Sequence, residues 1–540
     1  MPTSARMRPI RMICLVAVMA SACCARGHAA TNAPAFVVES GLVSDQVLQR
    51  DASDRAQVTV RGKATHSGAS AVELRVVRRH IVVEPFEWAR AANVKDGKWQ
   101  AEIKNIPLGG PYELQFRLLD ESNAVLATTE IHGILVGDLW VLSGQSNMVG
   151  NGRLVDLEPP HELVHNFNMR DEWEVAEEPL HSLAESINEA NWRNAGHLRP
   201  LWARPDQPTT GPLEGEDRKR FRRNRQHGTG LALTFAKRIV TETGIPIGLI
   251  PCAHGGTSIG PAGWDPARKD QGRKSLYGAQ FARVQAVGGK VKGVLWHQGE
   301  ADAFGANAEA YGERFRNLVA KMRTDYNQPD LPFYYVQIGC YVTEDPGLWN
   351  KIQETQRLAE ASIPHVGMVV SIDQPLDDII HVSGAGLKTL GERLAKRVLH
   401  DVYPQAEKYR DLKTGPRPVR AFVQVEQGKL DPWSGERRTL TLEFSGVNGR
   451  LQAEGRISGF SLRSADGSQE VPAIFRAIVD RSNPHRVLLE LGRGIPNKPL
   501  PPGTKLWYGW GTNPYCNLTD EAGFAVPVFG PLEIEGIEKP

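Results

Sequence analysis

The segment that decides the fold class is Ile134-Leu135-Val136-Gly137-Asp138-Leu139-Trp140-Val141-Leu142, followed by Ser143-Gly144-Gln145-Ser146-Asn147-Met148. Its first nine residues are nearly all apolar, which is typical of a strand in a parallel sheet that is covered on both faces. A serine soon after such a strand stands where a helix begins, with backbone N–H groups free around it. The segment therefore predicts an α/β domain with a functional edge at the carboxyl ends of its strands.

The downstream sequence alternates between strand and helix patterns and extends this domain over residues 131–410. Residues 155–228 interrupt the alternation and are predicted to be an insertion that is functional or disordered. Its tract Arg218-Lys219-Arg220-Phe221-Arg222-Arg223-Asn224-Arg225 is interpreted as a solvated loop balanced by nearby acids. The predicted strands are 247–250, 291–296, 333–338 and 366–372, and the predicted helices are 231–242, 308–323 and 385–399.

Both flanks of this domain have the period of two that marks strands with one buried face. Alternating segments separated by Gly-rich turns indicate a small β-sandwich over residues 31–130, and a second β domain over 415–540. The segments that carry this prediction are 57–62, 72–77, 99–103, 112–118, 439–444 and 487–491.

Residues 1–30 have the pattern of a signal peptide. Arg6, Arg8 and Arg11 precede a short apolar run, and small residues follow it. The run is too short for a transmembrane helix, so we expect no such segment in the mature chain. The pattern predicts export to the periplasm or the extracellular space, and a lipid anchor at Cys23 is the less favoured alternative.

Composition and charge are those of an ordinary soluble globular protein. The 540 residues are 41% hydrophobic and 23% charged, and the formal net charge is +2. This balance excludes a disordered chain and a multi-span membrane protein, and it gives no field that would recruit nucleic acid. Beyond the signal, only Cys252, Cys340 and Cys516 remain, so at most one disulfide forms and no Cys-x-x-Cys metal pair exists.

Two of the four polar segments that follow predicted strands carry candidate nucleophile and amide groups. Ser146 is the first candidate, since a hydroxyl at a helix start lies beside amides that stabilise a developing anion. The serine N-cap of a helix is the alternative. The paired glycines of His254-Gly255-Gly256-Thr257 allow close backbone approach and free amides, and a plain turn is the alternative there.

The other two segments carry the titratable groups. In His297-Gln298-Gly299-Glu300-Ala301-Asp302, the Gln298 amide is a possible donor to an oxyanion. Glu300 and Asp302 form either a carboxylate pair of the kind used in glycoside hydrolysis or a helix N-terminal pair. Asp378 and His381 are three residues apart, which lets the carboxylate hold the imidazole Nδ1–H while Nε2 takes a proton from serine.

Together, the segments Gly144–Met148, Gly255–Thr257, His297–Glu300 and Asp378-x-x-His381 resemble the SGNH/GDSL hydrolases, and more closely the carbohydrate acetylesterases of the sialate O-acetylesterase type. The resemblance extends into both β domains. It is carried there by the segments Val47-Leu48-Gln49-Arg50, Asp96-Gly97-Lys98-Trp99, Gly109-Gly110-Pro111-Tyr112 and Tyr508-Gly509-Trp510-Gly511-Thr512-Asn513-Pro514.

The resemblance implies a flavodoxin-like three-layer domain and a serine esterase that removes O-acetyl groups from sugars without a metal or other cofactor. It implies Ser146 as nucleophile, His381 as general base and acid, and Asp378 as the orienting carboxylate, with Glu300 as a rival for that third role. It also implies an oxyanion hole made by the N–H groups of Ser146 and Gly256 and by the Gln298 side chain, which stands where the superfamily commonly has Asn.

Acetylated sialic acid, acetylxylan and other acetylated polysaccharides all remain open as substrates. A sialate would favour a basic pocket, to which Arg153 or Arg220–Arg225 could contribute. Two functions of other classes also remain: a glycosidase that uses Glu300 and Asp302, and a carbohydrate-binding protein without activity. The sequence predicts nothing about the oligomeric state.

Overall fold

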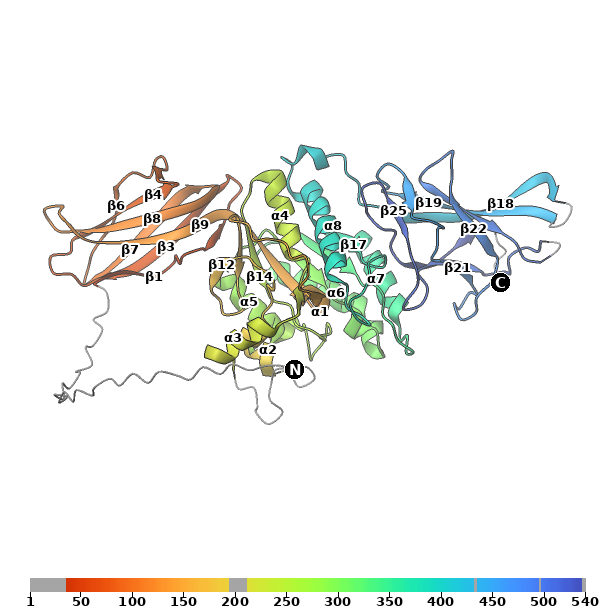
Figure 1. The fold of residues 1–540 in the computed structure, drawn as a ribbon, viewed down its shortest axis with the longest axis horizontal. Coiled ribbons are helices and arrows are strands. Elements are labelled where there is room, and N and C mark those ends of the chain that lie inside the picture. Colours follow the sequence, from red (N-terminus) through yellow and green to blue (C-terminus); the bar gives the residue numbers. More distant parts are fainter. Residues whose placement is uncertain (1–34, 194–210, 432–434, 495–496, 537–540) are drawn as a thin grey trace, which may run out of the picture.

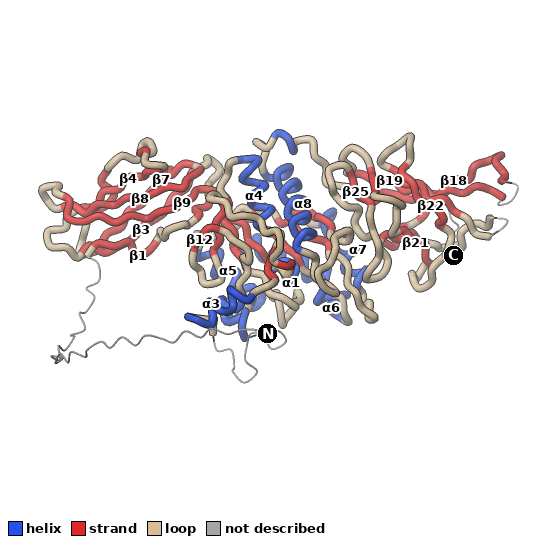
Figure 2. Tube along the Cα trace, viewed as in Figure 1, coloured by secondary structure: helices blue, strands red, loops and turns tan. Residues whose placement is uncertain are grey.

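The computed structural model describes residues 35–193, 211–431, 435–494 and 497–536, so the predicted signal peptide and Cys23 lie outside it. Figure 1 shows an elongated molecule in which two β regions flank a central part that holds the long helices. Coloured by secondary structure in Figure 2, the two ends consist of strands and loops. None of the helices in the described ranges has both the length and the apolar character needed to cross a bilayer.

A mostly parallel sheet forms the middle of the molecule, as predicted, and only its edge strand β12 runs antiparallel. The chain adds strands first on one side of β9 and then on the other, so the topological switch point lies between β9 and β15. From edge to edge the strands are β12 (Trp173–Val175), β11 (Val164–Phe167), β14 (Ile247–Pro251), β9 (Val125–Gly144), β15 (Gly293–His297), β16 (Phe333–Gln337) and β17 (Val366–Val370).

Helices cover both faces of this sheet, and alternate residues of β9 show why. Trp140 and Leu142 are buried against one pair of helices, whereas Leu139 and Val141 belong to the core on the other face. The first face is covered by α4 (Ala232–Thr243) and α8 (Gly384–Val402), and the second by α5 (Leu276–Ala286), α6 (Ala306–Asp325) and α7 (Trp349–Ser362). The predicted helices α4, α6 and α8 are confirmed, while α5 and α7 were not predicted.

The segment predicted as an insertion contributes to the sheet rather than only interrupting it. Its strand β11 pairs in parallel with β14. Its basic tract forms the helix α3 (Gly215–Asn224), not a loop, and Arg218 and Arg222 both bind the buried carboxylate of Glu185. The segment also holds η1 (Leu183–Glu185) and α2 (Glu189–Arg193). At its end, β13 (His227–Thr229) pairs with β10 (Gly152–Arg153), which precedes the segment.

The N-terminal β region packs two sheets around one apolar core. Trp99 and Phe116, from opposite sheets, lie with their rings 5.5 Å apart. One sheet holds β1 (Phe36–Ser40), β3 (Arg55–Ala64) and β7 (Lys98–Pro107), and the other holds β4 (Ala71–Arg78), β5 (Ile81–Val82), β6 (Ala89–Asn93) and β8 (Gly109–Leu119) together with β9.

The strand β9 belongs to both regions and runs without a break across position 130, where the sequence predicts a boundary. The short strand β2 (Val47–Gln49) pairs with it in parallel. Arg50 and Gln49 bind the fully buried carboxylate of Asp138, with Arg50 Nη2 2.8 Å and Nε 3.0 Å from its two oxygens. The Val47–Arg50 motif thus neutralises a buried charge on the strand that leads to Ser146.

The C-terminal β region consists of mostly antiparallel strands packed on the end of the α/β part; β27 pairs with β18 in parallel, and β26 contacts α7. One sheet has the order β22 (Ile474–Val479), β23 (Arg486–Leu491), β19 (Gly435–Ser445), β18 (Arg417–Asp431) and β27 (Ile534–Glu535). The other strands are β20 (Leu451–Ala453), β21 (Phe460–Arg463), β24 (Lys505–Tyr508), β25 (Leu518–Asp520) and β26 (Phe529–Leu532).

Candidate active site

Ser146 begins the short helix α1 (Ser146–Val149) directly after β9. Gly144 makes the preceding turn possible, because its φ is +131° and a Cβ there would meet the carbonyl oxygen of His297 at 2.2 Å. The next amide, of Gln145, donates to that same oxygen at 2.9 Å. The ends of β9 and β15 are therefore locked together beside the serine, at the switch point of the sheet.

A cavity of about 430 Å³ opens at this point, and residues from all four sequence segments line it. Ser146 is half-buried there, and Gly255 and Gly256 follow β14. Glu300 follows β15, and His381 lies between β17 and α8. The structure thus brings together predicted site residues that are up to 235 positions apart in the chain. The other lining residues are Gln145, Val149, Asn151, Leu183, Ala301, Phe304, Tyr341 and Ile380.

Asp378 and His381 form the local pair that their spacing predicts. The carboxylate Oδ2 lies 2.6 Å from the imidazole Nδ1, while Oδ1 accepts the backbone N–H groups of Ile380 and His381. Partial burial works against ionisation of Asp378, but the hydrogen bonds from His381 and the two amides outweigh it and lower the pKa of the carboxyl. An ionised carboxylate on Nδ1 leaves Nε2 as the free nitrogen of the ring.

Two backbone amides are suited to hold an oxyanion. Gly256 has φ +69°. Within the described ranges, neither its N–H nor that of Ser146 donates a hydrogen bond. Both residues line the cavity. Unused amides beside a nucleophile are the arrangement that stabilises a tetrahedral intermediate.

Gln298 does not take the place that the sequence predicts for it. Its Nε2 donates to the carbonyl oxygen of Thr257 at 3.1 Å and to Asp302 at 2.5 Å, and the side chain is fully buried outside the residues that line the cavity. Asp302 in turn accepts the N–H of Ile259 at 2.8 Å. The predicted Gln298 donor to the oxyanion is therefore revised: both amide hydrogens are engaged in fixing the turn that carries Gly256.

Glu300 reaches the cavity but is almost entirely buried, with 4% of its surface exposed. Its Oε1 accepts a hydrogen bond from Asn147 Nδ2 at 2.7 Å, and its Oε2 has no partner among the described residues. Burial raises the pKa of this carboxyl, and the hydrogen bond from Asn147 counteracts the rise only in part. Burial likewise raises the pKa of Asp302, to about 6.

Asn147 is a site residue to which the sequence assigned no role. Besides its bond to Glu300, its Oδ1 accepts the N–H of Val382 at 3.0 Å. It therefore ties the segment after β15 to the segment that carries His381. Its only signal in the sequence is its place next to Ser146.

Two buried histidines, His254 and His297, belong to the sequence segments that supply the site, but neither lines the cavity. Burial lowers the pKa of His254 to about 4 and that of His297 to about 3. Neither ring nitrogen of His297 has a hydrogen-bond partner in the described part of the chain. His381, which is 21% exposed in its side chain, is the imidazole that faces the cavity.

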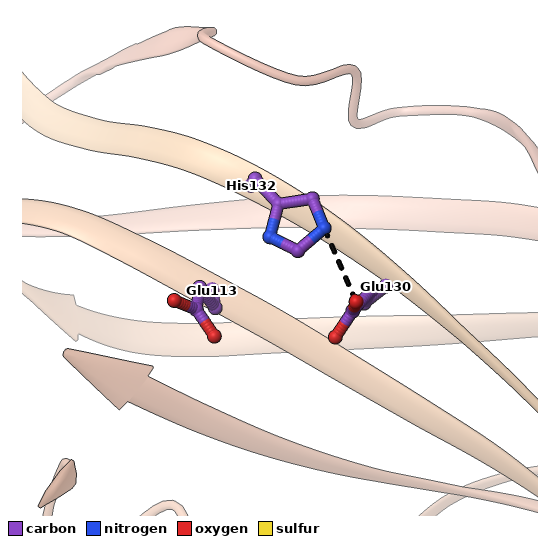
Figure 3. Close-up of side chains that lie close together, drawn as sticks. All are labelled: Glu113, Glu130 and His132. Atoms are coloured by element: carbon purple, nitrogen blue, oxygen red, sulfur yellow. Dashed lines mark ion pairs between the residues drawn. The ribbon is translucent and has the colours of Figure 1, made fainter. Parts of the chain in front are cut away.

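A carboxylate and imidazole cluster lies elsewhere, on the N-terminal β region. Figure 3 shows Glu113 of β8 beside Glu130 and His132 of β9. Their potential ligand atoms lie within 4.8 Å of one another, and His132 Nε2 lies 3.3 Å from Glu130. Glu130 and His132 are exposed and none of the three lines the catalytic cavity, so this cluster is not part of the candidate active site.

Comparisons with known proteins agree on a family. The sequence model of the family described as "Carbohydrate esterase, sialic acid-specific acetylesterase" matches residues 136–400. A probable carbohydrate esterase of Arabidopsis thaliana is 30% identical over 271 residues, which are 48% of this chain and 90% of that protein. The sialate O-acetylesterase of Homo sapiens is 21% identical over 376 residues, which are 63% of this chain and 65% of that protein.

One solved structure extends the likeness to nearly the whole chain. A carbohydrate acetylesterase of Xanthomonas citri superposes with a TM-score of 0.58 at 23% identity, over 92% of this chain and 99% of that one. The arrangement of the flanking β regions around the α/β part therefore recurs in another protein.

Proposed function

Because the chain belongs to the carbohydrate esterase family of the sialic acid-specific acetylesterases, which are carboxylic ester hydrolases, we propose that it removes O-acetyl groups from sugars through an acyl-enzyme on Ser146. The observation that carries this proposal is the shared cavity. Ser146, Gly256 and His381 line it, and the Asp378 carboxylate lies 2.6 Å from His381 Nδ1.

In the first half of the reaction, His381 Nε2 takes the proton of the Ser146 hydroxyl as its oxygen attacks the acetyl carbonyl. Asp378 holds the Nδ1–H and stabilises the imidazolium that forms. His381 then gives the proton to the sugar oxygen, which leaves as a free hydroxyl while the acetyl group stays on Ser146.

The backbone N–H groups of Ser146 and Gly256 stabilise the negatively charged oxygen of the tetrahedral intermediate by hydrogen bonds. Each such donor in comparable sites contributes ~3 kcal/mol to the transition state. Gln298 is a positioning residue here, since it holds the carbonyl of Thr257, next to Gly256.

In the second half, water enters and attacks the acyl-enzyme while His381 takes one of its protons. His381 then returns that proton to the Ser146 oxygen as its bond to the acyl carbon breaks, which releases acetate and restores the hydroxyl. None of these steps draws on a metal or another cofactor. Asp378 already occupies Nδ1 of His381, so Glu300, whose pKa is raised by burial, is not needed as the carboxylate partner.

The residues around the cavity favour a neutral sugar over a sialate. Among the described residues that line it, none is Lys or Arg, so the carboxylate of a sialic acid would meet no cation there. Arg153 is 65% exposed beside Asp377, and Arg220 pairs with Asp217 on α3. An acetylated neutral glycan fits this lining better.

The glycosidase alternative requires two carboxyl groups on opposite sides of one cavity. Glu300 lines the cavity, but Asp302 is fully buried and bound to Ile259 and Gln298. The esterase is therefore the better supported function.

The test is acetate release by the wild type and by Ser146→Ala from O-acetylated sialic acid, acetylated xylan and p-nitrophenyl acetate. We expect the wild type to release acetate and the variant to lose ~10⁴-fold or more in kcat. Full activity of Ser146→Ala would refute the acyl-enzyme. Preference for the acetylated sialic acid would refute the neutral-sugar assignment while leaving the esterase intact.

Export remains a proposal that rests on residues 1–30. Mass determination of the N-terminus of the protein secreted by its host tests it. A chain that retains Arg6 and Arg8 would count against the signal peptide.

A further inference from the structure

A second hollow lies between α7 and the C-terminal β region, with a volume of about 400 Å³. We call it the tryptophan groove. Leu348 and Trp349 line it from the α/β part, and Trp507, Trp510 and Pro531 line it from the C-terminal β region. Aromatic walls with few polar groups are typical of small-molecule binding sites.

The tryptophan groove shares a wall with the catalytic cavity. The ring of Tyr341, which lines the cavity, lies 5.2 Å from that of Trp349 in the groove. Phe304, which also lines the cavity, packs against Gly347 of the groove so closely that a Cβ there would meet its ring at 2.8 Å. A ligand long enough to pass Phe304 and Tyr341 would therefore contact both hollows.

The loop that carries Trp510 is held in place before any ligand binds. Asn350 of α7 donates to the carbonyl oxygens of Gly509 and Gly511 at 2.9 and 3.3 Å, and its Oδ1 accepts the Gly511 N–H at 2.8 Å. The backbone N–H of Tyr341 donates to the carbonyl oxygen of Thr512 at 2.6 Å. A fixed loop avoids the entropy cost of ordering on binding.

The groove suits a neutral ligand rather than an ion. Trp507 is 8% exposed and its indole N–H is buried, so this indole contributes an apolar wall. The two charged residues that line the groove are already paired, Lys351 with Glu309 and Glu354 with Arg357. No side-chain charge of the described lining is left for an ionic ligand.

We propose that the tryptophan groove binds a neutral sugar unit of the same glycan whose acetyl group occupies the catalytic cavity. A C–H face of a pyranose packs on the indole of Trp510, which is the partly exposed one of the three, and its hydroxyls bond to the nearby backbone. The substrate is then an acetylated neutral oligo- or polysaccharide rather than a free monosaccharide. This assignment rests on the proposed esterase function. It adds that the substrate glycan has several sugar units and no charge.

The experiment compares partially acetylated xylotetraose and cellotetraose with the corresponding acetylated monosaccharides. For the wild type we expect at least one tetrasaccharide to exceed its monosaccharide in kcat/KM by about tenfold or more, and Trp510→Ala to bring that ratio close to one. Thr355→Tyr, which adds bulk in the groove and removes no indole, should lower the same ratio. Tyr515→Ala, 70% exposed on the same β region and outside the groove, is the matched control with an unchanged ratio.

A binding measurement separates this inference from the function on which it rests. Titration calorimetry of Ser146→Ala with unacetylated xylotetraose or cellotetraose should show binding that weakens about tenfold with Trp510→Ala added. Tetrasaccharide binding at the groove without acetate release by the wild type would refute the esterase alone. Equal kcat/KM for long and short substrates, or equal loss on both in a folded Trp510→Ala, would refute the groove. A dimer that Trp510→Ala converts to monomer in light scattering would assign the groove to a second copy of the chain and also refute it.

Discussion

Two segments at the same edge of the sheet, His297–Asp302 at the end of β15 and Asp377–Ser383 between β17 and α8, have similar residue types and different chemistry. Each contains two carboxyl groups and an imidazole. In the second segment Asp378 is 50% exposed in its side chain and its pKa is lowered by hydrogen bonds from His381 and two amides. In the first, Glu300 and Asp302 are buried and their pKa values are raised.

The difference shows that a position after a strand brings a polar cluster to the functional edge, whereas burial decides its charge. The exposed segment has an ionised carboxylate and a free imidazole nitrogen at the cavity. The buried segment supplies hydrogen bonds that hold the turn of Gly256 and the segment of His381. In the proposed mechanism, the exposed segment transfers protons and the buried segment fixes positions.

The largest expected effect comes from breaking the exposed pair. Asp378→Asn should lower kcat by about 10³-fold, because the amide selects the wrong tautomer of His381 and no longer stabilises its imidazolium. The measurement is kcat for p-nitrophenyl acetate, with circular dichroism as the check on folding. Activity within a few fold of the wild type would show that the carboxylate comes from elsewhere.

A smaller effect is expected in the buried segment. Glu300→Gln should lower kcat about tenfold or less, because Gln keeps the acceptor for Asn147 and replaces a buried carboxyl that does not contact Nδ1 of His381. Comparison with Asp378→Asn in the same assay decides the third member of the triad. A loss for Glu300→Gln that exceeds the loss for Asp378→Asn would give that role to Glu300.

The smallest effect on activity, with a clear effect on stability, is expected for Asp302→Asn. In the folded protein the pKa of Asp302 is about 6, above its ordinary value of 3.8. The folded state therefore binds a proton that the unfolded chain has lost, so this stabilisation is complete below about pH 4 and is lost as the pH rises through 6. Asn retains an acceptor for Ile259 and Gln298 and has no such loss.

Urea unfolding at pH 5 and pH 8 measures this effect. At pH 8 Asp302→Asn should exceed the wild type in free energy of unfolding by about 2 kcal/mol, and the advantage should shrink at pH 5. A difference that is the same at both pH values would show that Asp302 titrates normally. The variant should retain kcat within about threefold, since Asp302 does not line the cavity.

The sequence predicted what local patterns determine. The β9 strand, the α/β class and the Asp378–His381 contact follow from apolar runs and from a spacing of three residues. It failed where polar side chains are buried by distant partners. Helix α7 was not predicted because Gln353 and Gln356 occupy its core face and bind the backbone at Ile338 and Gln298, so the apolar period is missing.

The same reason explains the revised role of Gln298. Its chemistry as a donor was evident, but its acceptors, Thr257 and Asp302, are chosen by the fold. Likewise β11 carries the buried polar residues His165 and Asn166, which hid a strand of the sheet inside a polar segment. The residue type indicates which hydrogen bonds a side chain can make. Only its tertiary surroundings determine which partner it binds.

Because β9 is one continuous strand, it connects the N-terminal sandwich directly to Ser146, the proposed nucleophile. A chain that lacks the residues before Val125 would leave the first half of that strand without its paired neighbours. The second half would still have to position Ser146. The sandwich is therefore not a separate domain on a flexible linker. It supports the strand that ends two residues before Ser146, the proposed nucleophile.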